Sequence, residues 1–591
     1  MKKIFTAFAS LILLASMAQA QTMSDALTFG SSDYYGTART LGMGNAVTAV
    51  GGDMGTIAVN PAGGAVSSFS QFTFSTGWST AGSSSSYAPS YDSYNQSANY
   101  VGEFKDSKTR MTIPNVGINL YFETGNRHGV LGWNFGVMVN RSQTFTRMFS
   151  GASTDGSMEG HTSMTGALAS QADGMPGNIL GNNGKYDTNY AWNSIVAYDG
   201  GLINYNNDAG TYYGSAETKT KIGDNYTYEM RGWLDQHIGS TTIGSKNDII
   251  VNYGVNVDNR LFLGATINCP IINYRFSEFY SEAAPQNSTD FPVTPEYING
   301  DGKYVAGDPT YYLGSTYKYH YSASISGINA KIGAIWLPTD GLRIGAAIQT
   351  PTAYTVNEEW YVDVESQFQD SAQNGYGSTP TAETTYDFRA PYSANFGIAY
   401  TIGRAAMLSV DYELTDFSVM KFSETYIDGE YSYEDPFYRV NRLNKLFCGV
   451  AHSVRAGVEF RVLPSISLRA GINYSTSPVR HYVDNEGYTV FASDYDNWFD
   501  DYESGKYHLQ GKGTYASDNI FAVTFGAGYS SQGSFYCDLA FKRTTLPDNY
   551  YQPYSNYLSH TVDGKVYDIV SPSVRSKLSL FDAVFTFGWR F

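Results

Sequence analysis

Several common features are scarce in this chain of 591 residues. After residue 20 no apolar run approaches the ~20 residues that a membrane-spanning helix needs, so a helical membrane protein is excluded. Cysteine occurs only 3 times, which excludes a disulfide framework. The 38 basic residues are outnumbered by 55 acidic ones, for a net charge of −17. Nucleic acids require a basic binding face, so we expect no nucleic-acid partner.

The motifs of catalysis and cofactor binding are also missing. The eight histidines are scattered without the spacing of metal ligands, and there is no Gly-x-Ser-x-Gly elbow or Walker loop. Residues 299–303 resemble part of a calcium loop, but Tyr297 would occupy the first ligand position, so we interpret them as a turn. We therefore expect no enzymatic activity, no cofactor and no bound metal.

The first 20 residues predict export from the cytoplasm. Lys2 and Lys3 precede an apolar stretch from Ile4 to Leu14, and Ala18-Gln19-Ala20 is a small-residue cleavage signal. This layout is typical of a bacterial secretory signal peptide, because the apolar stretch is too short to span a membrane. We expect a mature chain that begins at Gln21.

Alternation of apolar and polar residues dominates the rest of the chain. Between 132 and 140, for example, Trp133, Phe135, Val137 and Val139 occupy every second position, as in a β-strand with one apolar face. Fourteen segments show this pattern, at 70–79, 110–123, 129–149, 247–258, 260–280, 315–337, 341–368, 383–401, 405–425, 446–463, 465–482, 518–530, 533–548 and 575–591.

The connections between these segments alternate between long and short along the chain. An outer-membrane barrel has this pattern, with short periplasmic turns and long external loops, whereas a secreted array of β-sandwiches has no reason for it. The sequence predicts an all-β fold, a transmembrane antiparallel β-barrel of about 14 strands in the bacterial outer membrane. The terminal Phe591 resembles the signal that barrel-assembly machinery recognises, and we expect a monomer.

Residues 21–68 lack the alternation of a strand and are rich in Gly, Ala and Thr. A barrel of 14 strands is wide enough to need filling. We therefore predict three parts: the signal peptide at 1–20, an N-terminal hatch inside the barrel at 21–68, and the barrel with its long extracellular loops at 69–591.

This N-terminal segment resembles one protein family. Its motif residues are Arg39, Gly42, Gly44, Asp53, Asn60, Pro61, Ala62 and Gly63. Together with short matches at 330–333, 342–345, 350–352 and 467–471, they resemble the long-chain fatty-acid transporters of Gram-negative outer membranes, the FadL type. The resemblance extends over the whole mature chain. It implies a plugged 14-stranded barrel that takes up hydrophobic molecules passively.

The resemblance also implies an exit for the ligand. In the family, ligand caught by the external loops passes a lumenal pocket and leaves sideways through a gap in the wall, next to a kinked third strand. The third segment of this chain carries Gly132 and Gly136, which could permit such a bend. Glycine is common in all the segments, so the position of the gap stays open.

Charged residues on the inward side of the strands predict a lumenal charge network. Both signs are present, and confined charges need partners, so we expect contacts between walls and between wall and hatch. Direct binding of a fatty-acid carboxylate by an arginine is the alternative. These residues are Lys331, Arg343, Asp411, Glu413, Arg455, Glu459, Arg469, Asp538 and Asp582.

Other features support two interpretations each. The acidic residues Asp494, Asp496, Asp500, Asp501 and Glu503 form either a solvated loop or a site for divalent cations that bridge to lipopolysaccharide. Tyrosines in the long loops suit either ligand contact or loop packing. The parity of the strands places the three cysteines, Cys269, Cys448 and Cys537, on the lipid-facing side.

The sequence thus favours a channel for passive uptake of hydrophobic small molecules such as long-chain fatty acids, in contact with outer-membrane lipid and lipopolysaccharide. The alternative is an outer-membrane binding or adhesion barrel whose long loops capture a glycan, haem or protein. A barrel enzyme such as a lipase is least favoured, because no nucleophile and base are recognisable.

Overall fold

The computed structural model describes residues 22–88, 100–153, 162–180, 184–188, 190–222, 225–230, 232–294, 296–298, 304–306, 308–425, 435–531, 533–554, 557–558, 568–569 and 571–591. The expected signal peptide, His161, His560 and the loop at 299–303 lie outside these residues. Among the described residues, no helix has the length and apolarity needed to cross a membrane.

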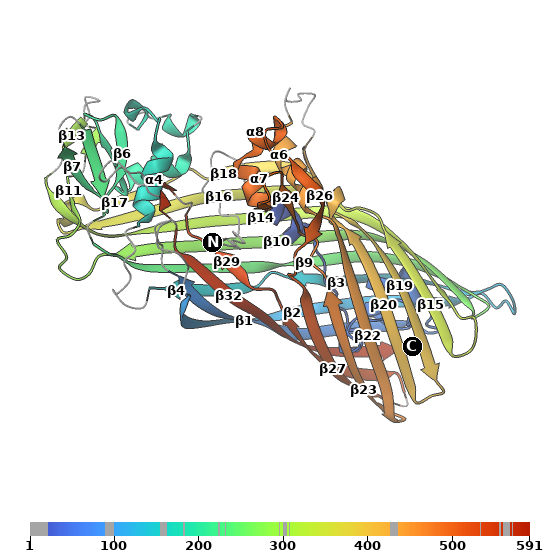
Figure 1. The fold of residues 1–591 in the computed structure, drawn as a ribbon. Coiled ribbons are helices and arrows are strands. Elements are labelled where there is room, and N and C mark those ends of the chain that lie inside the picture. Colours follow the sequence, from blue (N-terminus) through green and yellow to red (C-terminus); the bar gives the residue numbers. More distant parts are fainter. Residues whose placement is uncertain are drawn as a thin grey trace.

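The described strands form a closed antiparallel barrel of 14 staves, which confirms the predicted fold class (Figure 1). The last stave pairs with the first from Ser573–Ala88 to Arg590–Gln71, and this ladder closes the wall. In wall order the staves are β1 (Gln71–Ala88), β2 (Val101–Glu123), β3 with β4 (Val130–Thr144, Arg147–Ala152), β9 (Asp235–Val257), β10 (Leu261–Ala283), β14 (Thr310–Trp336), β15 with β16 (Leu342–Gln349, Ala353–Phe368), β19 with β18 (Tyr392–Ile402, Ala382–Arg389), β20 with β21 (Ala406–Asp416, Lys421–Glu424), β22 (Val450–Leu463), β23 (Ile466–Ser475), β27 (Ile520–Ser530), β28 with β29 (Phe535–Thr545, Asn549–Tyr551) and β32 (Ser573–Arg590).

The outer face carries an apolar belt. On β10, Leu263, Ile267 and Ile271 point outward and are 39–55% exposed, while Phe262 and Ile272 on the opposite parity are buried. Polar residues such as Asn273 take over on the outward parity beyond Ile271. Because lipid accepts only apolar side chains along a closed sheet, this belt marks the part of the wall that fits a membrane.

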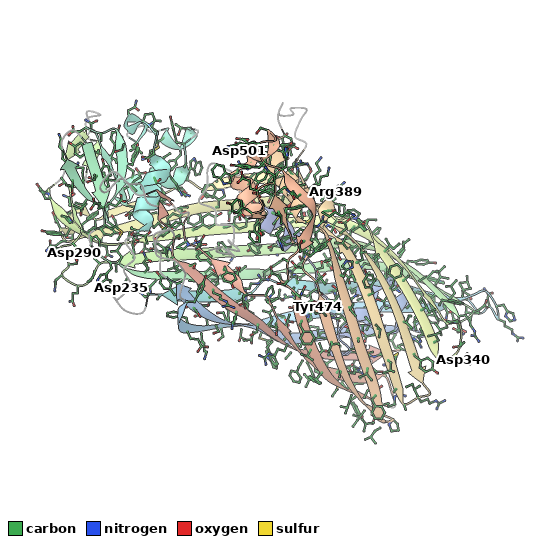
Figure 2. The ribbon with its side chains drawn as sticks, viewed as in Figure 1. Asp235, Asp290, Asp340, Arg389, Tyr474 and Asp501 are labelled. Atoms are coloured by element: carbon green, nitrogen blue, oxygen red, sulfur yellow. The ribbon has the colours of Figure 1, made fainter. Side chains whose placement is uncertain are left out.

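Several staves extend far beyond the belt at the end with the long loops (Figure 1). β9, β10 and β14 have 23, 23 and 27 residues, whereas a transmembrane strand needs only ~10. Asp340 lies in a short turn at one end, and Asp290 and Asp501 lie among the loops at the other (Figure 2). The long and short connections therefore separate to opposite ends, as the sequence predicts.

The long loops fold into two lobes (Figure 1). The first follows β4 and packs beside the small strands β11, β12 and β13. The second surrounds three helices between β21 and β27. The elements of the first are α4 (Met164–Ala172), η2 (Gly177–Ile179), η3 (Lys185–Asp187), α5 (Trp192–Asp199), β5 (Ile203–Asn206), β6 (Thr211–Gly214), β7 (Thr218–Ile222), β8 (Asn225–Glu229), β11 (Pro292–Val293), β12 (Glu296–Ile298) and β13 (Tyr304–Ala306). Those of the second are α6 (Tyr438–Phe447), β24 (Arg480–Asp484), β25 (Thr489–Val490), α7 (Ala492–Asn497), α8 (Phe499–Glu503) and β26 (Leu509–Tyr515).

Smaller pieces complete the described chain. They are η4 (Ser371–Gln373), β17 (Gly375–Ser378), η5 (Phe417–Val419), β30 (Tyr557–Leu558) and β31 (Asp568–Ile569).

The N-terminal segment, defined here as residues 22–69, lies against the inner walls. It contains α1 (Met23–Gly30), α2 (Ala38–Gly42), α3 (Met54–Val59) and η1 (Pro61–Gly64). α2 contacts β27, β28 and β32, while η1 contacts β9, β10 and β14. Short helices have little stability of their own, so these wall contacts hold the segment in shape.

Candidate functional site

Caps determine the helices of the N-terminal segment. The Asp53 carboxylate accepts hydrogen bonds from the Gly55 amide at 2.9 Å and from the Thr37 hydroxyl at 2.5 Å, so one side chain begins α3 and fastens it to the residue that caps α2. The Asn60 side chain accepts from the Ala62 amide at 3.1 Å and donates to the carbonyl of Thr48 at 2.7 Å.

The remaining motif residues join this segment to the wall. The Asn60 amide also donates to the Ala334 carbonyl on β14 at 3.1 Å, and Asn252 on β9 donates to the Pro61 carbonyl at 3.0 Å. The Gly42 carbonyl accepts from Thr524 at 3.1 Å. Ala62 is fully buried, and the Gly63 amide donates to the Asn60 carbonyl at 2.9 Å.

Gly44 lies close against two strands of the barrel. Its φ is +64°, in the left-handed region that favours glycine. A Cβ there would lie 2.9 Å from the Ile472 carbonyl oxygen and 3.2 Å from that of Ala456. Glycine is therefore required both by the backbone turn and by the neighbouring strands β23 and β22.

An ion-pair chain links α2 to two staves of the wall. Arg39 binds the Glu459 carboxylate on β22 through Nε at 2.9 Å and Nη2 at 3.2 Å. Arg469 on β23 donates to the same carboxylate at 2.6 Å and to Asp538 on β28 at 2.5 Å. The Glu459 carboxylate raises the pKa of the Arg39 guanidinium above its ordinary value. Paired in this way, the four charges can remain buried.

A second group of charges lies on neighbouring staves. Arg455 pairs with Glu413 at 2.8 Å and donates to Asn395 at 2.7 Å. The Asp411 carboxylate accepts from the Thr48 amide of the N-terminal segment at 2.7 Å. Lys331 donates to the Ala58 carbonyl at 2.7 Å, and Arg343 donates to that of Val50 at 2.5 Å. These wall charges thus bind backbone groups of the segment as well as each other.

Sequence reasoning missed three further contacts. Lys246 on β9 is buried and donates to the carbonyls of Phe29 at 3.3 Å and Ser31 at 3.1 Å. Lys542 on β28 forms an ion pair with Asp33. Asp582, which the sequence did predict on the inward side, is 1% exposed and is the register partner of Lys542. Lys246 and Lys542 occupy inward parity in their strands, which is the signal that could have identified them.

A small polar cavity of ≈ 180 Å³ lies beside the end of α1. Its lining includes Ser31, Lys246, Lys331, Tyr354 and Glu413. Above it, toward the loops, aromatic and aliphatic side chains of α1, the strands and the loops form a continuous buried cluster. The lumen is therefore filled at its loop end by apolar packing and near the N-terminal segment by paired charges.

The ladder between the second and third staves ends partway along both strands. β2 pairs with β3 from Glu123–Gly132 as far as Asn115–Asn140, and then the two strands separate. β4, which continues the third stave, pairs with β9 alone. Ser150 of β4 donates to Asp106 of β2 at 2.6 Å. We call the unpaired stretch between these two contacts, residues 107–114 opposite 141–149, the wall window.

Proline explains where the window begins. Pro114 directly precedes Asn115, where the ladder with β3 ends, and it has no amide hydrogen to donate. The ladder of β2 with β1 is also irregular there, between Ser75–Asn115 and Gly77–Thr112. Gly132 and Gly136 lie in a stretch paired with both β2 and β9, so they lie outside the window, and a bend at these glycines stays a prediction.

The third stave passes inside the barrel above the break. Asp106 pairs with Ser83, a buried residue on the inward parity of β1, so its bond to Ser150 lies on the inner side of the wall. A Cβ on Gly151 of β4 would lie 2.6 Å from Val574 on β32. The two edges of the window therefore overlap: the inner face of β2 faces the outer face of β3 and its neighbours.

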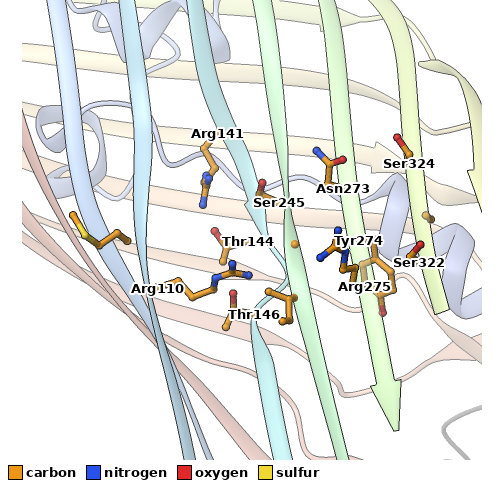
Figure 3. Close-up of a pocket in the computed structure, with 14 residues that line it drawn as sticks. Arg110, Arg141, Thr144, Thr146, Ser245, Asn273, Tyr274, Arg275, Ser322 and Ser324 are labelled. Carbon is orange, nitrogen blue, oxygen red and sulfur yellow. The ribbon is translucent and has the colours of Figure 1, made fainter. Parts of the chain in front are cut away.

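A pocket of ≈ 400 Å³ occupies this overlap (Figure 3). Its lining comes from β2, β3, β9, β10 and β14, and includes three arginines, several hydroxyl groups and no carboxylate. Figure 3 shows Arg110, Arg141 and Arg275 directed toward a common space around Thr144 and Thr146. We call it the window pocket.

The predicted loop features are placed as follows. Asp494 accepts from the Phe491 amide, Asp496 pairs with Arg439 at 2.5 Å, and Glu503 pairs with Arg442 at 2.9 Å. The acidic residues therefore bind groups of their own lobe. Among the described residues no group of three potential ligands could hold a metal ion.

One cysteine differs from its expected position. Cys269 and Cys537 are partly exposed residues of β10 and β28, but Cys448 is buried. It caps α6 and bridges to Val479 beneath the second lobe, so the expected lipid-facing position is wrong for Cys448. The predicted strand at 446–463 begins too early, because α6 continues to Phe447 and β22 starts only at Val450. Cys448 therefore lies before the strand, and the parity of the strand does not apply to it.

No protein-family model and no curated protein matches the chain. Among solved structures it is similar to a FadL homologue from Pseudomonas aeruginosa, at 13% identity, with 94% of this chain and 99% of that chain covered and a TM-score of 0.44. It is also similar to the toluene transporter TodX of P. putida, at 13% identity, 95% and 99% coverage and a TM-score of 0.39. The toluene transporter TbuX of Ralstonia pickettii is 12% identical, with 95% of this chain and 99% of that chain covered and a TM-score of 0.40.

Proposed function

We propose that this chain is a bacterial outer-membrane channel for the passive uptake of hydrophobic small molecules. The observation that carries the proposal is the wall window. A barrel that only anchors its loops gains nothing from a ladder broken at the edge of the apolar belt, because an unpaired backbone group that meets lipid costs free energy. A channel that releases an apolar cargo sideways into lipid requires such a break.

The N-terminal segment acts in this proposal as the hatch at 21–68. It fills the lumen, and polar contacts such as Arg39–Glu459 and Asn60–Ala334 fasten it to the wall. Cargo would pass from the loops to the lumenal cavity beside α1 and then to the window. No cofactor or energy source is needed, since an apolar solute moves down its own gradient.

Long-chain fatty acids are the cargo implied by the sequence resemblance, and aromatic hydrocarbons are the second class to test. The solved structures similar to this chain include a FadL homologue and toluene transporters. We further propose that the channel is a monomer inserted by the barrel-assembly machinery, with its loops in contact with lipopolysaccharide.

The experiment is an uptake assay in a strain that lacks this chain, with the wild-type gene restored on a plasmid. We expect uptake of at least one long-chain fatty acid or aromatic hydrocarbon to fall in the deletion strain and to recover with the plasmid. A small sugar serves as the control solute and should be unaffected. Wild-type uptake of every hydrophobic solute in the deletion strain would contradict the proposal.

The folded lobes favour a second candidate, a binding or adhesion barrel. Trp192 and Trp360 lie 5.3 Å apart at the base of the first lobe, and Tyr186 packs on Trp192 at 5.5 Å. Such rigid amphipathic side chains suit contact with a glycan or protein. Alanine at Trp192 should then abolish binding of whole cells to the partner and leave uptake unchanged, whereas a lobe used only for transport would show the opposite result.

A further inference from the structure

We propose that the window pocket binds the phosphate headgroup of a lipid from the surrounding outer leaflet. This inference rests on the outer-membrane placement in the proposed function but not on transport. It begins with a contrast in charge. The lumenal arginines Arg39, Arg455 and Arg469 all pair with carboxylates. In the described part of the chain, the guanidinium groups of the window pocket form no ion pair and no hydrogen bond.

Three cations gather around a space whose lining holds no anion; the Asp582 carboxylate acts on the charge of Arg141 but does not line the pocket. Arg110 and Arg275 are exposed, and the Nε atom of Arg141 is buried without a hydrogen-bond partner. Like charges brought together destabilise the fold unless a counterion occupies the space between them. The pocket contains no Asp or Glu that could serve. The missing partner is therefore an anion that enters from the surrounding phase.

The chemistry of the lining favours a phosphate over a carboxylate. A phosphate monoester carries a charge of about −1.5 to −2 and three acceptor oxygens, whereas a carboxylate carries −1 and two. Planar guanidinium groups match phosphate oxygens with paired hydrogen bonds. The hydroxyls of Thr144, Ser245 and Ser322 supply further donors around the same space.

The height of the pocket on the wall favours a lipid over a free anion. Directly below it, the outward residues are apolar: Val139 on β3, Ile249 on β9, Ile271 on β10 and Ile328 on β14, all 37–55% exposed. The next outward positions are polar, and they include Arg141, Asn273 and Ser326. The pocket thus lies at the edge of the belt, where headgroups meet acyl chains.

Met111 extends this argument to the acyl chain. It lines the pocket, is 84% exposed, and pairs with the outward Trp78 of β1. Ile113, two residues nearer the belt, is 53% exposed. A headgroup held by the arginines would lay its chain across these apolar residues at the edge of the window.

The test uses the full chain in a neutral detergent and native mass spectrometry. The probe is dodecyl phosphate, compared with dodecanoate and with inorganic phosphate. We expect one tightly bound dodecyl phosphate in the wild type. The variant R110Q/R141Q/R275Q should bind it at least about 100-fold more weakly, since each charge-assisted contact contributes about tenfold. The control variant R389Q/K421Q/K577Q removes three exposed cations elsewhere and should bind as the wild type does.

The single variant R275Q separates loss of binding from misfolding, because Arg275 is exposed and makes no described side-chain contact. We expect it to bind dodecyl phosphate about tenfold more weakly than the wild type. Equal binding by the triple variant and the control would overturn the inference. Dodecanoate that binds as tightly as dodecyl phosphate would indicate a carboxylate cargo site instead. Inorganic phosphate that competes at equal concentration would indicate a free-anion site. Wild-type uptake of every hydrophobic solute in the deletion strain, with binding of dodecyl phosphate intact in the purified protein, would count against transport alone.

Discussion

Replacement of Glu459 by glutamine tests whether ion pairs hold the N-terminal segment in the barrel. Glu459 is the one carboxylate that binds both Arg39 of α2, at 2.9 Å, and Arg469 of β23, at 2.6 Å. Glutamine has nearly the same size, but it loses the charge and turns an NH₂ group toward a guanidinium. Arg469 keeps Asp538 as a partner, whereas Arg39 loses the carboxylate that forms its ion pair.

The magnitude follows from the burial of the pair. Removing one partner of a fully buried ion pair costs about 3–5 kcal/mol. The side chains of Arg39 and Glu459 are 21% and 14% exposed, so water compensates part of the loss. We expect α2 to lose about 2 kcal/mol of local stability, which corresponds to an opening that is about 30-fold more frequent.

Amide hydrogen exchange of residues 38–42 measures this opening. The Leu41 amide donates to the Thr37 carbonyl at 3.0 Å and exchanges only when α2 opens. E459Q should therefore exchange about 30-fold faster there, with the barrel strands unchanged. The control is E365Q, which removes an exposed pair with Lys318 at 3.4 Å and should have no effect. Exchange of α2 in E459Q within about threefold of the wild type would refute the reasoning.

Three further predictions address the same segment. Burial raises the pKa of Asp25 in α1 from its ordinary value of 3.8 to about 6, so its contribution to α1 docking is complete below pH ~4 and is lost as the pH rises through about 6. Proteolysis of the segment should therefore be faster at pH 7.5 than at pH 5, and D25N, which stays neutral, should abolish this difference. G44A should lower the local stability of the segment by about 2 kcal/mol or more, measured by hydrogen exchange. G403A, where φ is +55° but no atom lies within 4 Å of the added Cβ, should cost only about 1 kcal/mol, and equal effects would contradict the close packing at Gly44. K246M should expose residues 29–32 to protease through loss of three hydrogen bonds, and unchanged protection would show that they contribute nothing.

The barrel itself was predictable because apolar and polar residues alternate in every strand. Alternation such as Trp133, Phe135, Val137 and Val139 specifies an apolar outer face, and the loop asymmetry specifies the end that faces outward. Strand lengths were less predictable. β1 continues through the serines of 83–86, which have the composition of a loop, because its upper half pairs above the belt, where polar residues face outward.

The inward position of the site residues was predictable, but their partners were not. Parity alone brought the inward charges to notice, but it could not say that Arg39 meets Glu459 across 420 positions of the sequence. The window depends on Pro114, a single residue in an otherwise regular strand, and on strands that separate in space. The arginines of the window pocket come from three staves, and only the inward path of the third stave brings them together.

The most direct test of lateral release closes the window with a cross-link. Cysteines replace Ile113 and Arg141, which lie on the outward side of the two edges of the window, and a short bismaleimide joins them. The control pair, at Ile118 and Val137, is already in register in the closed part of the wall. Purified protein in lipid vesicles is then assayed for uptake of the hydrophobic solute identified in cells. We predict that the cross-link at 113 and 141 abolishes uptake while that at 118 and 137 leaves it unchanged. Full uptake with the window cross-linked would contradict lateral release.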